Sequence, residues 1–143
     1  MNIPTYLSGT LQVKAYRILR SHVYNCLSEY DLNPSHWSLL GIVVQADDGV
    51  RLAKVAELLG FKAPLITLMA NELIDRNLIK RIPHHSDARA KLLVITPEGK
   101  HFVAKVEQTL NAQLRILLKG LSMEDMATYH KVLVTIIEND SLI

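Results

Sequence analysis

The chain has 143 residues, of which 49% are hydrophobic, and its formal net charge is +2. This length favours one compact unit with enough apolar residues for a core, and no apolar run is long enough to span a membrane. The N-terminus lacks the pattern of a signal peptide, and Cys26 is a lone cysteine, which excludes an intramolecular disulfide and favours a reducing cytoplasm.

The first third of the chain predicts two helices. Apolar residues recur at helical spacing over 5–30, in a stripe wide enough to predict burial on more than one side. Asn33 is a good N-cap and Pro34 a good first helical residue, so a second helix is expected over 34–45. Its predicted buried residues are Trp37, Leu40 and Val44.

The middle of the chain predicts a helix-turn-helix, which is two helices joined by a tight turn containing glycine. Residues 51–60 form a short amphipathic pattern that Gly60 ends, and a second helix follows over 63–76 with Pro64 in its first turn. The second helix is expected to bury Ile66, Met69, Ala70 and Leu73. Between the second helix of the chain and this pair, Val50 and Arg51 are predicted to add a short strand at the base of the hairpin described next.

Two strands, 78–82 and 91–95, flank the polar loop 83–90, and a β-hairpin behind a helix-turn-helix is a wing. Thr96, Pro97 and Glu98 then repeat the cap-and-proline start of a helix, which carries an apolar seam from Phe102 to Leu121. A capping box at Ser122 to Asp125 begins the last helix. The predicted fold class is mainly α (α+β), a winged helix-turn-helix flanked by N- and C-terminal dimerisation helices.

Several short segments carry a family pattern: Leu52-Ala53 with Leu58-Leu59-Gly60, then 73–79, Arg81, 87–92 and 95–99. Together they resemble the MarR-type winged-helix transcriptional regulators over about 32–100. In that family the wing usually reads Asp-Arg-Arg and the strand ends Leu-Thr-x-x-Gly. This chain keeps Asp87 and Arg89 but has Ala88 between them, which removes one expected phosphate contact.

The resemblance implies a single unit over 1–143, with a DNA-binding lobe at 32–100 and a helical dimerisation region formed by 1–31 and 101–143. The terminal helices are more apolar than a small winged helix needs, which favours a homodimer because an identical copy is the commonest partner. The alternative is that these helices cover the core of a monomer.

A homodimer would place two recognition helices in successive major grooves, about 10 bp apart, on a near-palindromic double-stranded DNA. Thr67 and Asn71 are expected to contact base edges, and Arg89 at the wing tip is expected to enter the minor groove. By resemblance, Asp87 pairs with Arg89 or a neighbouring Arg and holds the loop. The candidate DNA-contacting residues are Arg51, Lys62, Pro64, Leu65, Thr67, Leu68, Asn71, Arg76, Arg81, Asp87, Arg89 and Lys91.

Charge is unevenly distributed in a way that agrees with this interpretation. Residues 51–100 hold nine Lys or Arg against five Asp or Glu, while the segments on either side are each slightly acidic. The resemblance also implies a small-molecule effector in a cleft between the dimer helices and the DNA-binding lobe. The candidate lining residues are Tyr16, His22, Tyr30, His36, Trp37 and Phe102.

Other functions find little support in the sequence. Motifs for phosphate-binding loops, hydrolase nucleophiles and zinc sites are lacking, so neither an enzyme nor a metal or cofactor is expected. Cys26 lies among apolar neighbours, which predicts a buried, inert thiol. The function expected is a homodimeric transcriptional repressor, and the alternative is a winged-helix protein-interaction module that does not read DNA sequence.

Overall fold

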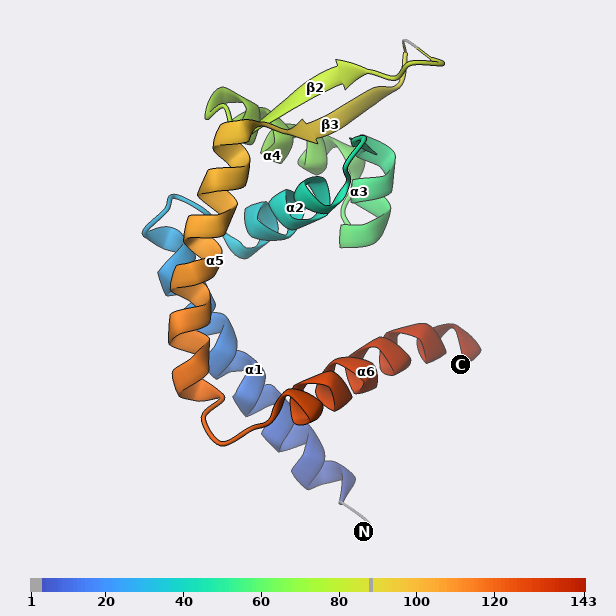
Figure 1. The fold of residues 1–143 in the computed structure, drawn as a ribbon. Helices are drawn as coiled ribbons and strands as arrows, with labels where there is room; N and C mark the ends of the chain where they lie inside the picture. Colours follow the sequence, from blue (N-terminus) through green and yellow to red (C-terminus); the bar gives the residue numbers. More distant parts are fainter. Residues whose placement is uncertain (1–3, 88) are drawn as a thin grey trace. The chain divides into compact units, whose positions relative to one another are not determined.

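The computed structural model describes residues 4–87 and 89–143, which are mainly helical with a small sheet (Figure 1). The chain divides into two compact units, Met1–Leu110 and Asn111–Ile143. The elements in order are α1 (Thr5–Ser28), α2 (Pro34–Gln45), β1 (Val50–Arg51), α3 (Leu52–Leu59), α4 (Ala63–Asp75), β2 (Ile79–Pro83), β3 (Lys91–Ile95), α5 (Pro97–Leu117), α6 (Met123–Asn139) and a short 3-10 turn (Asp140–Leu142). The winged helix-turn-helix fold predicted from the sequence is confirmed.

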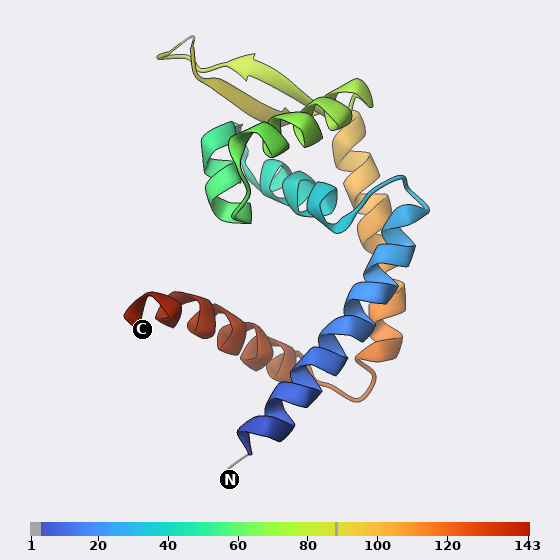
Figure 2. The same ribbon diagram turned by 180° about the vertical axis from the view of Figure 1, so that it is seen from behind.

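The first unit has one apolar core beneath the sheet. Helices α2, α3 and α4 pack against one another, α4 contacts β2, and α2 contacts β3, so the core lies where these elements meet (Figure 2). The fully buried side chains of this core include Leu27, Leu39, Leu40, Val43, Val55, Ile66, Leu73, Ile79, Leu93 and Val106. Burial of apolar surface on this scale is the main force that holds the unit together.

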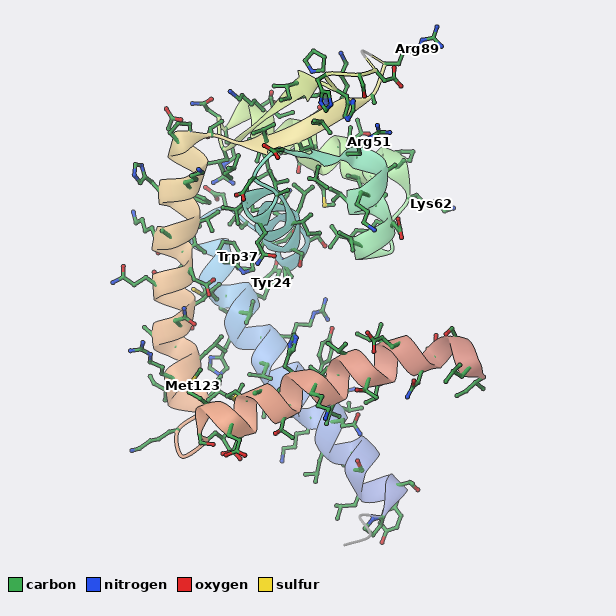
Figure 3. All side chains as sticks on the ribbon, turned by 45° about the vertical axis from the view of Figure 1, so that its right-hand side comes forward. Tyr24, Trp37, Arg51, Lys62, Arg89 and Met123 are labelled. Atoms are coloured by element: carbon green, nitrogen blue, oxygen red, sulfur yellow. The ribbon has the colours of Figure 1, made fainter. Side chains whose placement is uncertain are left out.

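The buried face of α2 differs from the predicted one. Leu39, Leu40 and Val43 are buried, whereas Trp37 and Val44, which were expected in the core with Leu40, are only partly buried. The reason is that apolar residues surround this helix on most sides, so helical spacing alone does not select its inner face. Trp37 still packs against the edge of the core (Figure 3).

The sheet has the strand order β1-β3-β2, with β3 paired antiparallel to both neighbours. Val50 faces Leu93 across the first pair, and Ile79 faces Ile95 across the second. The predicted short strand at Val50 and Arg51 is therefore confirmed. Beyond the register pair Pro83 and Lys91, the hairpin continues into the wing loop, which extends past the helices (Figure 1).

A tight joint connects the end of α4 to the start of α5. Asn77 adopts the left-handed conformation (φ 58°), and the backbone N–H of Leu78 donates to the carbonyl of Leu73, which ends α4. Thr96 is buried, and its hydroxyl donates toward the carbonyls of Asn77 (2.7 Å) and Leu78 (3.0 Å). The same oxygen accepts from the backbone N–H of Gly99 at 2.9 Å, so it also caps α5.

The second unit contains α6, which begins at the predicted capping box. Ser122 Oγ accepts from the backbone N–H of Asp125 (3.0 Å), and the carboxylate of Asp125 accepts from the backbone N–H and the hydroxyl of Ser122. The pKa of Asp125 is lowered mainly by the hydrogen bond from the backbone N–H of Ser122, and further by the bond from the Ser122 hydroxyl. None of the side chains of α6 is buried.

Helix α1 is buried only near its C-terminal end. Cys26 and Leu27 are its buried residues, so the expectation that the helix is covered on more than one side is wrong for the single chain. Of the apolar stripe that prompted it, Leu7, Leu11 and Ile18 are exposed and Leu19 and Val23 are only partly buried. Tyr6, Val13 and Tyr16 of the same helix are exposed as well, and these six exposed residues form the apolar stripe of α1. Within the residues described, no helix is both long and apolar enough to cross a membrane.

Candidate nucleic-acid interface

Helix α4 presents the outward face that the sequence predicts. Ile66, Met69, Ala70 and Leu73 are buried as expected. The helix begins after Gly60, whose left-handed conformation (φ 69°) turns the chain out of α3. The exposed residues of α4 include all the candidates placed on its outer face: Pro64, Leu65, Thr67, Leu68, Asn71 and Glu72.

The polar side chains on this face already have partners inside the protein. The Thr67 hydroxyl donates to the carbonyl of Ala63, one turn earlier, at 3.1 Å. The side-chain oxygen of Asn71 accepts from a terminal nitrogen of Arg81 on β2 at 2.9 Å. These hydrogen bonds restrict which hydrogen-bonding groups the face can offer to a ligand.

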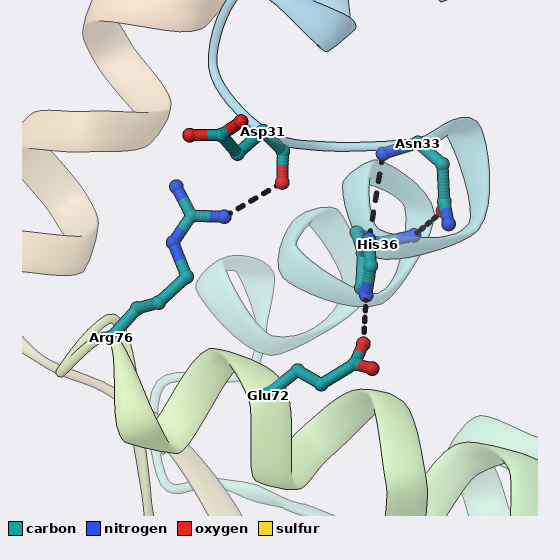
Figure 4. Close-up of polar contacts among 5 residues, drawn as sticks. All are labelled: Asp31, Asn33, His36, Glu72 and Arg76. Atoms are coloured by element: carbon teal, nitrogen blue, oxygen red, sulfur yellow. Dashed lines mark hydrogen bonds and ion pairs between the residues drawn. The ribbon is translucent and has the colours of Figure 1, made fainter.

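Glu72 is turned toward α2 (Figure 4). His36 Nε2 lies 2.6 Å from Glu72 Oε2, and the backbone N–H of Asn33 points at His36 Nδ1 at 3.4 Å. Because Nδ1 accepts, the ring proton belongs on Nε2, from which it is donated to the carboxylate. This connection between the start of α2 and α4 was missed from the sequence, since only the Asn33 cap gave a local signal for it.

The wing loop is shaped by Asp87. Its carboxylate accepts from the backbone N–H of Arg89 at 3.0 Å, and its carbonyl accepts from the backbone N–H of Ala90 at 3.1 Å. Asp87 therefore holds the loop, as expected, but through the backbone of Arg89 and not by the predicted ion pair with a guanidinium. Arg89 is exposed at the wing (Figure 3), and Ala88 lies outside the described residues.

Several cations lie on the same side of the first unit. Arg51, Lys62 and Arg89 all project from the side opposite α5 in Figure 3. A groove of about 840 Å³ runs between the wing base and the start of α3, and Arg51, Lys54, His84 and His85 are among the residues that line it. The rings of His84 and His85 are stacked with centroids 4.4 Å apart. Lys54 was not among the candidates predicted from the sequence, although it follows Arg51 by three residues, a spacing that brings two side chains close together.

Arg76 has a different environment from the predicted phosphate contact. Its two terminal nitrogens donate to the carbonyls of Tyr30 and Asp31, each at 2.9 Å, just after the end of α1, and Figure 4 shows the bond to Asp31. Its guanidinium also lies over the ring of Phe102, 5.3 Å from the centroid. Arg76 thus joins α1, α4 and α5 within the first unit, and its predicted contact with a phosphate stays a prediction.

Replacing Arg76 with alanine is expected to lower the free energy of unfolding by about 1–3 kcal/mol, because two charge-assisted hydrogen bonds and a cation–π contact are lost. Arg76→Lys should recover little, since an ammonium lacks the planar fork that reaches both carbonyls. Urea unfolding measures the free energy of unfolding of the wild type and of both variants. Unchanged stability, together with a salt slope of DNA binding reduced by about one, would instead restore the predicted phosphate contact.

The candidate effector residues have different surroundings in the single chain. Tyr30 and Phe102 pack edge to face at 6.0 Å, and the hydroxyl of Tyr30 is 2.6 Å from that of Thr109. His36 is bonded to Glu72, while Tyr16 and His22 are exposed on α1. A groove of about 720 Å³ on α1 is lined by other residues: Tyr6, Gly9, Thr10, Val13, Lys14, Arg17 and Ile18.

Cys26 is buried, as predicted. Burial raises the pKa of its thiol, and the carboxylate of Glu29 raises it further. A thiol in this setting remains protonated and is a poor nucleophile. In the described part of the chain, His, Cys, Asp and Glu side chains form no group of three or more that could hold a metal ion.

Comparison with known proteins agrees with this architecture. Residues 32–91 match the model of the MarR family. A MarR family transcriptional regulator from Rhodococcus sp. RHA1 superimposes with a TM-score of 0.80 at 20% identity, covering 95% of this chain and 96% of that one. CouR from Rhodococcus jostii RHA1, bound to p-coumaroyl-CoA, gives 0.80 at 23% identity and 90% coverage of each chain.

A structure that includes DNA also matches. A mutant MarR from E. coli complexed with operator DNA gives a TM-score of 0.73 at 19% identity, covering 90% of this chain and 91% of that one. Identities this low establish the shared fold, and the family model adds the match over the winged helix itself. Residues 32–91 therefore match the MarR family model, and the chain has the fold of solved MarR family transcriptional regulators.

Proposed function

We propose that the chain is a sequence-specific DNA-binding transcriptional regulator, a homodimeric repressor of a near-palindromic operator. The observation that carries the proposal is the arrangement of its exposed groups. The outer face of α4, the wing with Arg89, and the cations Arg51 and Lys62 all belong to one lobe and are free of the core. Helix, wing and phosphate-binding cations are the parts that a winged helix needs to bind a duplex.

The homodimer is supported by the surfaces that the single chain leaves uncovered. Helix α6 buries none of its side chains, and its exposed apolar residues include Tyr129, Val132, Leu133, Ile136 and Ile137. The exposed stripe on α1 adds further apolar surface. Apolar surface of this extent on a monomer marks an interaction site, and a second copy of the chain is the proposed partner.

The test is selection of bound duplexes from a random pool, followed by anisotropy titration of the selected sequence at several salt concentrations. The proposal expects an enriched inverted repeat with half-site centres about 10 bp apart and a steep loss of affinity with salt. A pool without enrichment, bound weakly and without regard to sequence, would contradict it. Reporter repression in the presence of the operator tests the direction of regulation.

Replacing Arg89 with alanine is expected to weaken binding to every duplex about equally, by about tenfold at physiological salt, because the wing loses its exposed guanidinium. Dimerisation and the selected sequence should not change. Asp87→Asn serves as the comparison: its amide oxygen can still accept from the backbone of Arg89 and one negative charge is removed, so its affinity for DNA should not fall. Equal affinities of wild type and Arg89→Ala would remove the wing tip from the interface.

A protein-interaction module is the second candidate, and one observation favours it. Exposed apolar side chains lie on α3, the following turn and the outer face of α4: Leu58, Phe61, Leu65 and Leu68. In the DNA-binding proposal, Leu65 and Leu68 contact thymine methyl groups. In the alternative, Leu65 and Leu68 bind a protein. Leu68→Ala would then abolish binding of that partner, and both the wild type and the variant would bind nucleic acid only weakly and without sequence preference.

The proposal includes release of the operator by a small ligand. Its support is the likeness to CouR and the groove on α1, where Lys14 and Arg17 lie beside the apolar Tyr6, Val13 and Ile18. Cations beside apolar side chains suit an amphipathic anion. Titrating p-coumaroyl-CoA into the operator complex should release DNA where coenzyme A alone does not, and release by neither would leave this groove without an effector of that type.

A further inference from the structure

The hydrogen bond between Arg81 and Asn71 joins the wing to the outer face of α4. Arg81 lies on β2, Asn71 lies on α4, and both side chains are exposed. The distance from the Arg81 terminal nitrogen to the Asn71 side-chain oxygen is 2.9 Å. This contact connects two elements that a winged helix uses for different parts of a DNA duplex.

The bond settles which way the Asn71 amide faces. A guanidinium has only donors, so the atom of Asn71 that faces Arg81 must be its oxygen. The amide nitrogen, with its two N–H groups, is left on the other side and has no hydrogen-bond partner among the residues the structure describes. Glu72, the neighbouring acid on the same helix, is engaged by His36 and does not compete for Arg81 (Figure 4).

This orientation changes what Asn71 can read. An unrestrained Asn recognises adenine with both atoms, accepting from N6 and donating to N7. With its oxygen turned towards Arg81, the side chain has its N–H donors on the other side, and guanine is the base whose major-groove edge offers two acceptors, O6 and N7, and no donor. The Thr67 hydroxyl has the opposite character, because its proton is donated to Ala63 and its lone pairs can only accept.

We propose that Arg81 is a positioning residue that makes Asn71 a hydrogen-bond donor, and that this pair selects guanine over adenine at one base pair of each half-site. The inference rests on the proposed function, because it needs α4 in a major groove. It goes beyond the proposed function by stating that Asn71 donates, rather than accepts, the hydrogen bonds to its base, which the fold alone does not determine. Holding the amide before binding also lowers the entropy lost on complex formation.

The experiment is duplex selection with wild type, Arg81→Ala and Lys80→Ala. Lys80 is the matched control, because it is an exposed cation next to Arg81 on β2 whose side chain points to the other face of the sheet. Wild type should prefer guanine over adenine at one position by about tenfold. Arg81→Ala frees the oxygen of Asn71, so the preference should fall below about twofold or reverse towards adenine.

Lys80→Ala should lower affinity through lost charge but keep the guanine preference, and the base pair read by Thr67 should not change in any of these variants. Asn71→Asp provides a second measurement. It keeps an acceptor for Arg81 but replaces the donor with an oxygen, so the preference should move towards cytosine, whose amino group donates.

The failures of the two proposals are distinguishable. If Arg81→Ala binds an inverted repeat with the same base preference as wild type, the positioning role is overturned and the regulator remains. If the wild type selects no sequence at all, both the proposed DNA-binding function and the positioning role of Arg81 are contradicted.

Discussion

Replacing Gly99 with alanine is expected to lower the free energy of unfolding by about 3–4 kcal/mol, the largest effect among the alanine substitutions of the six glycines. A Cβ at Gly99 would overlap the carbonyl oxygen of Leu78 and lie 2.9 Å from its carbonyl carbon and 2.8 Å from Ile95 Cδ1. The atoms that the new methyl group would meet belong mainly to the backbone of Leu78, which cannot move aside by changing rotamer as a side chain can. The start of α5 would have to move away from the turn after α4.

Such a movement also breaks the bonds of Thr96, whose hydroxyl connects Gly99 to Asn77 and Leu78. Urea unfolding followed by circular dichroism measures the change. Gly41→Ala is the matched control, since a Cβ there meets nothing within 4 Å and Gly41 lies inside α2. It should be neutral or stabilise by about 0.5–1 kcal/mol. A wild-type unfolding midpoint for Gly99→Ala would contradict the close approach.

This joint explains two of the sequence segments that resemble the MarR family. The segment 73–79 supplies the end of α4 and the carbonyls of Asn77 and Leu78, and the segment 95–99 supplies Thr96 and Gly99. They are separated in sequence by the wing but meet at one point. Their residue types follow from the contact, because a short hydroxyl must bond two carbonyls and a residue without a side chain must fit against one of them.

Local sequence patterns were sufficient to predict the helices that are buried on one side only. The buried face of α4 follows from Ile66, Met69, Ala70 and Leu73, which recur at three- and four-residue intervals. The capping box of α6 and the left-handed turn at Gly60 are likewise local features. These elements could be predicted because their causes lie within four residues of their effects.

Contacts between distant segments were beyond such reasoning. Arg76 resembles an exposed cation at a helix end, and its carbonyl partners lie more than forty residues earlier in the chain. His36 is likewise bonded to Glu72, which belongs to another helix. Both were assigned to ligand contacts from residue type, whereas the structure shows them joining elements of the first unit. A sequence pattern does not show whether a polar side chain already has an intramolecular partner.

Replacing Ile136 with glutamate is expected to convert the proposed dimer into a folded monomer. Ile136 is exposed in the single chain, and α6 has no buried side chain, so the substitution costs the monomer little. In a two-fold interface the change occurs twice, which buries two new carboxylates in an apolar surface. Sedimentation velocity should show half the wild-type mass.

Loss of the dimer should also lower the affinity for the operator. A monomer loses the second half-site of the operator, so affinity for the full inverted repeat should fall by about 10²–10³-fold, while affinity for an isolated half-site stays unchanged. Thr135→Glu is the matched control, because it adds the same charge to a neighbouring exposed position about 100° around α6 from Ile136. That variant should remain dimeric and bind the full operator as wild type does. A dimeric Ile136→Glu protein with wild-type operator affinity would place the interface elsewhere, and the exposed apolar stripe of α1 would then be the surface to substitute next.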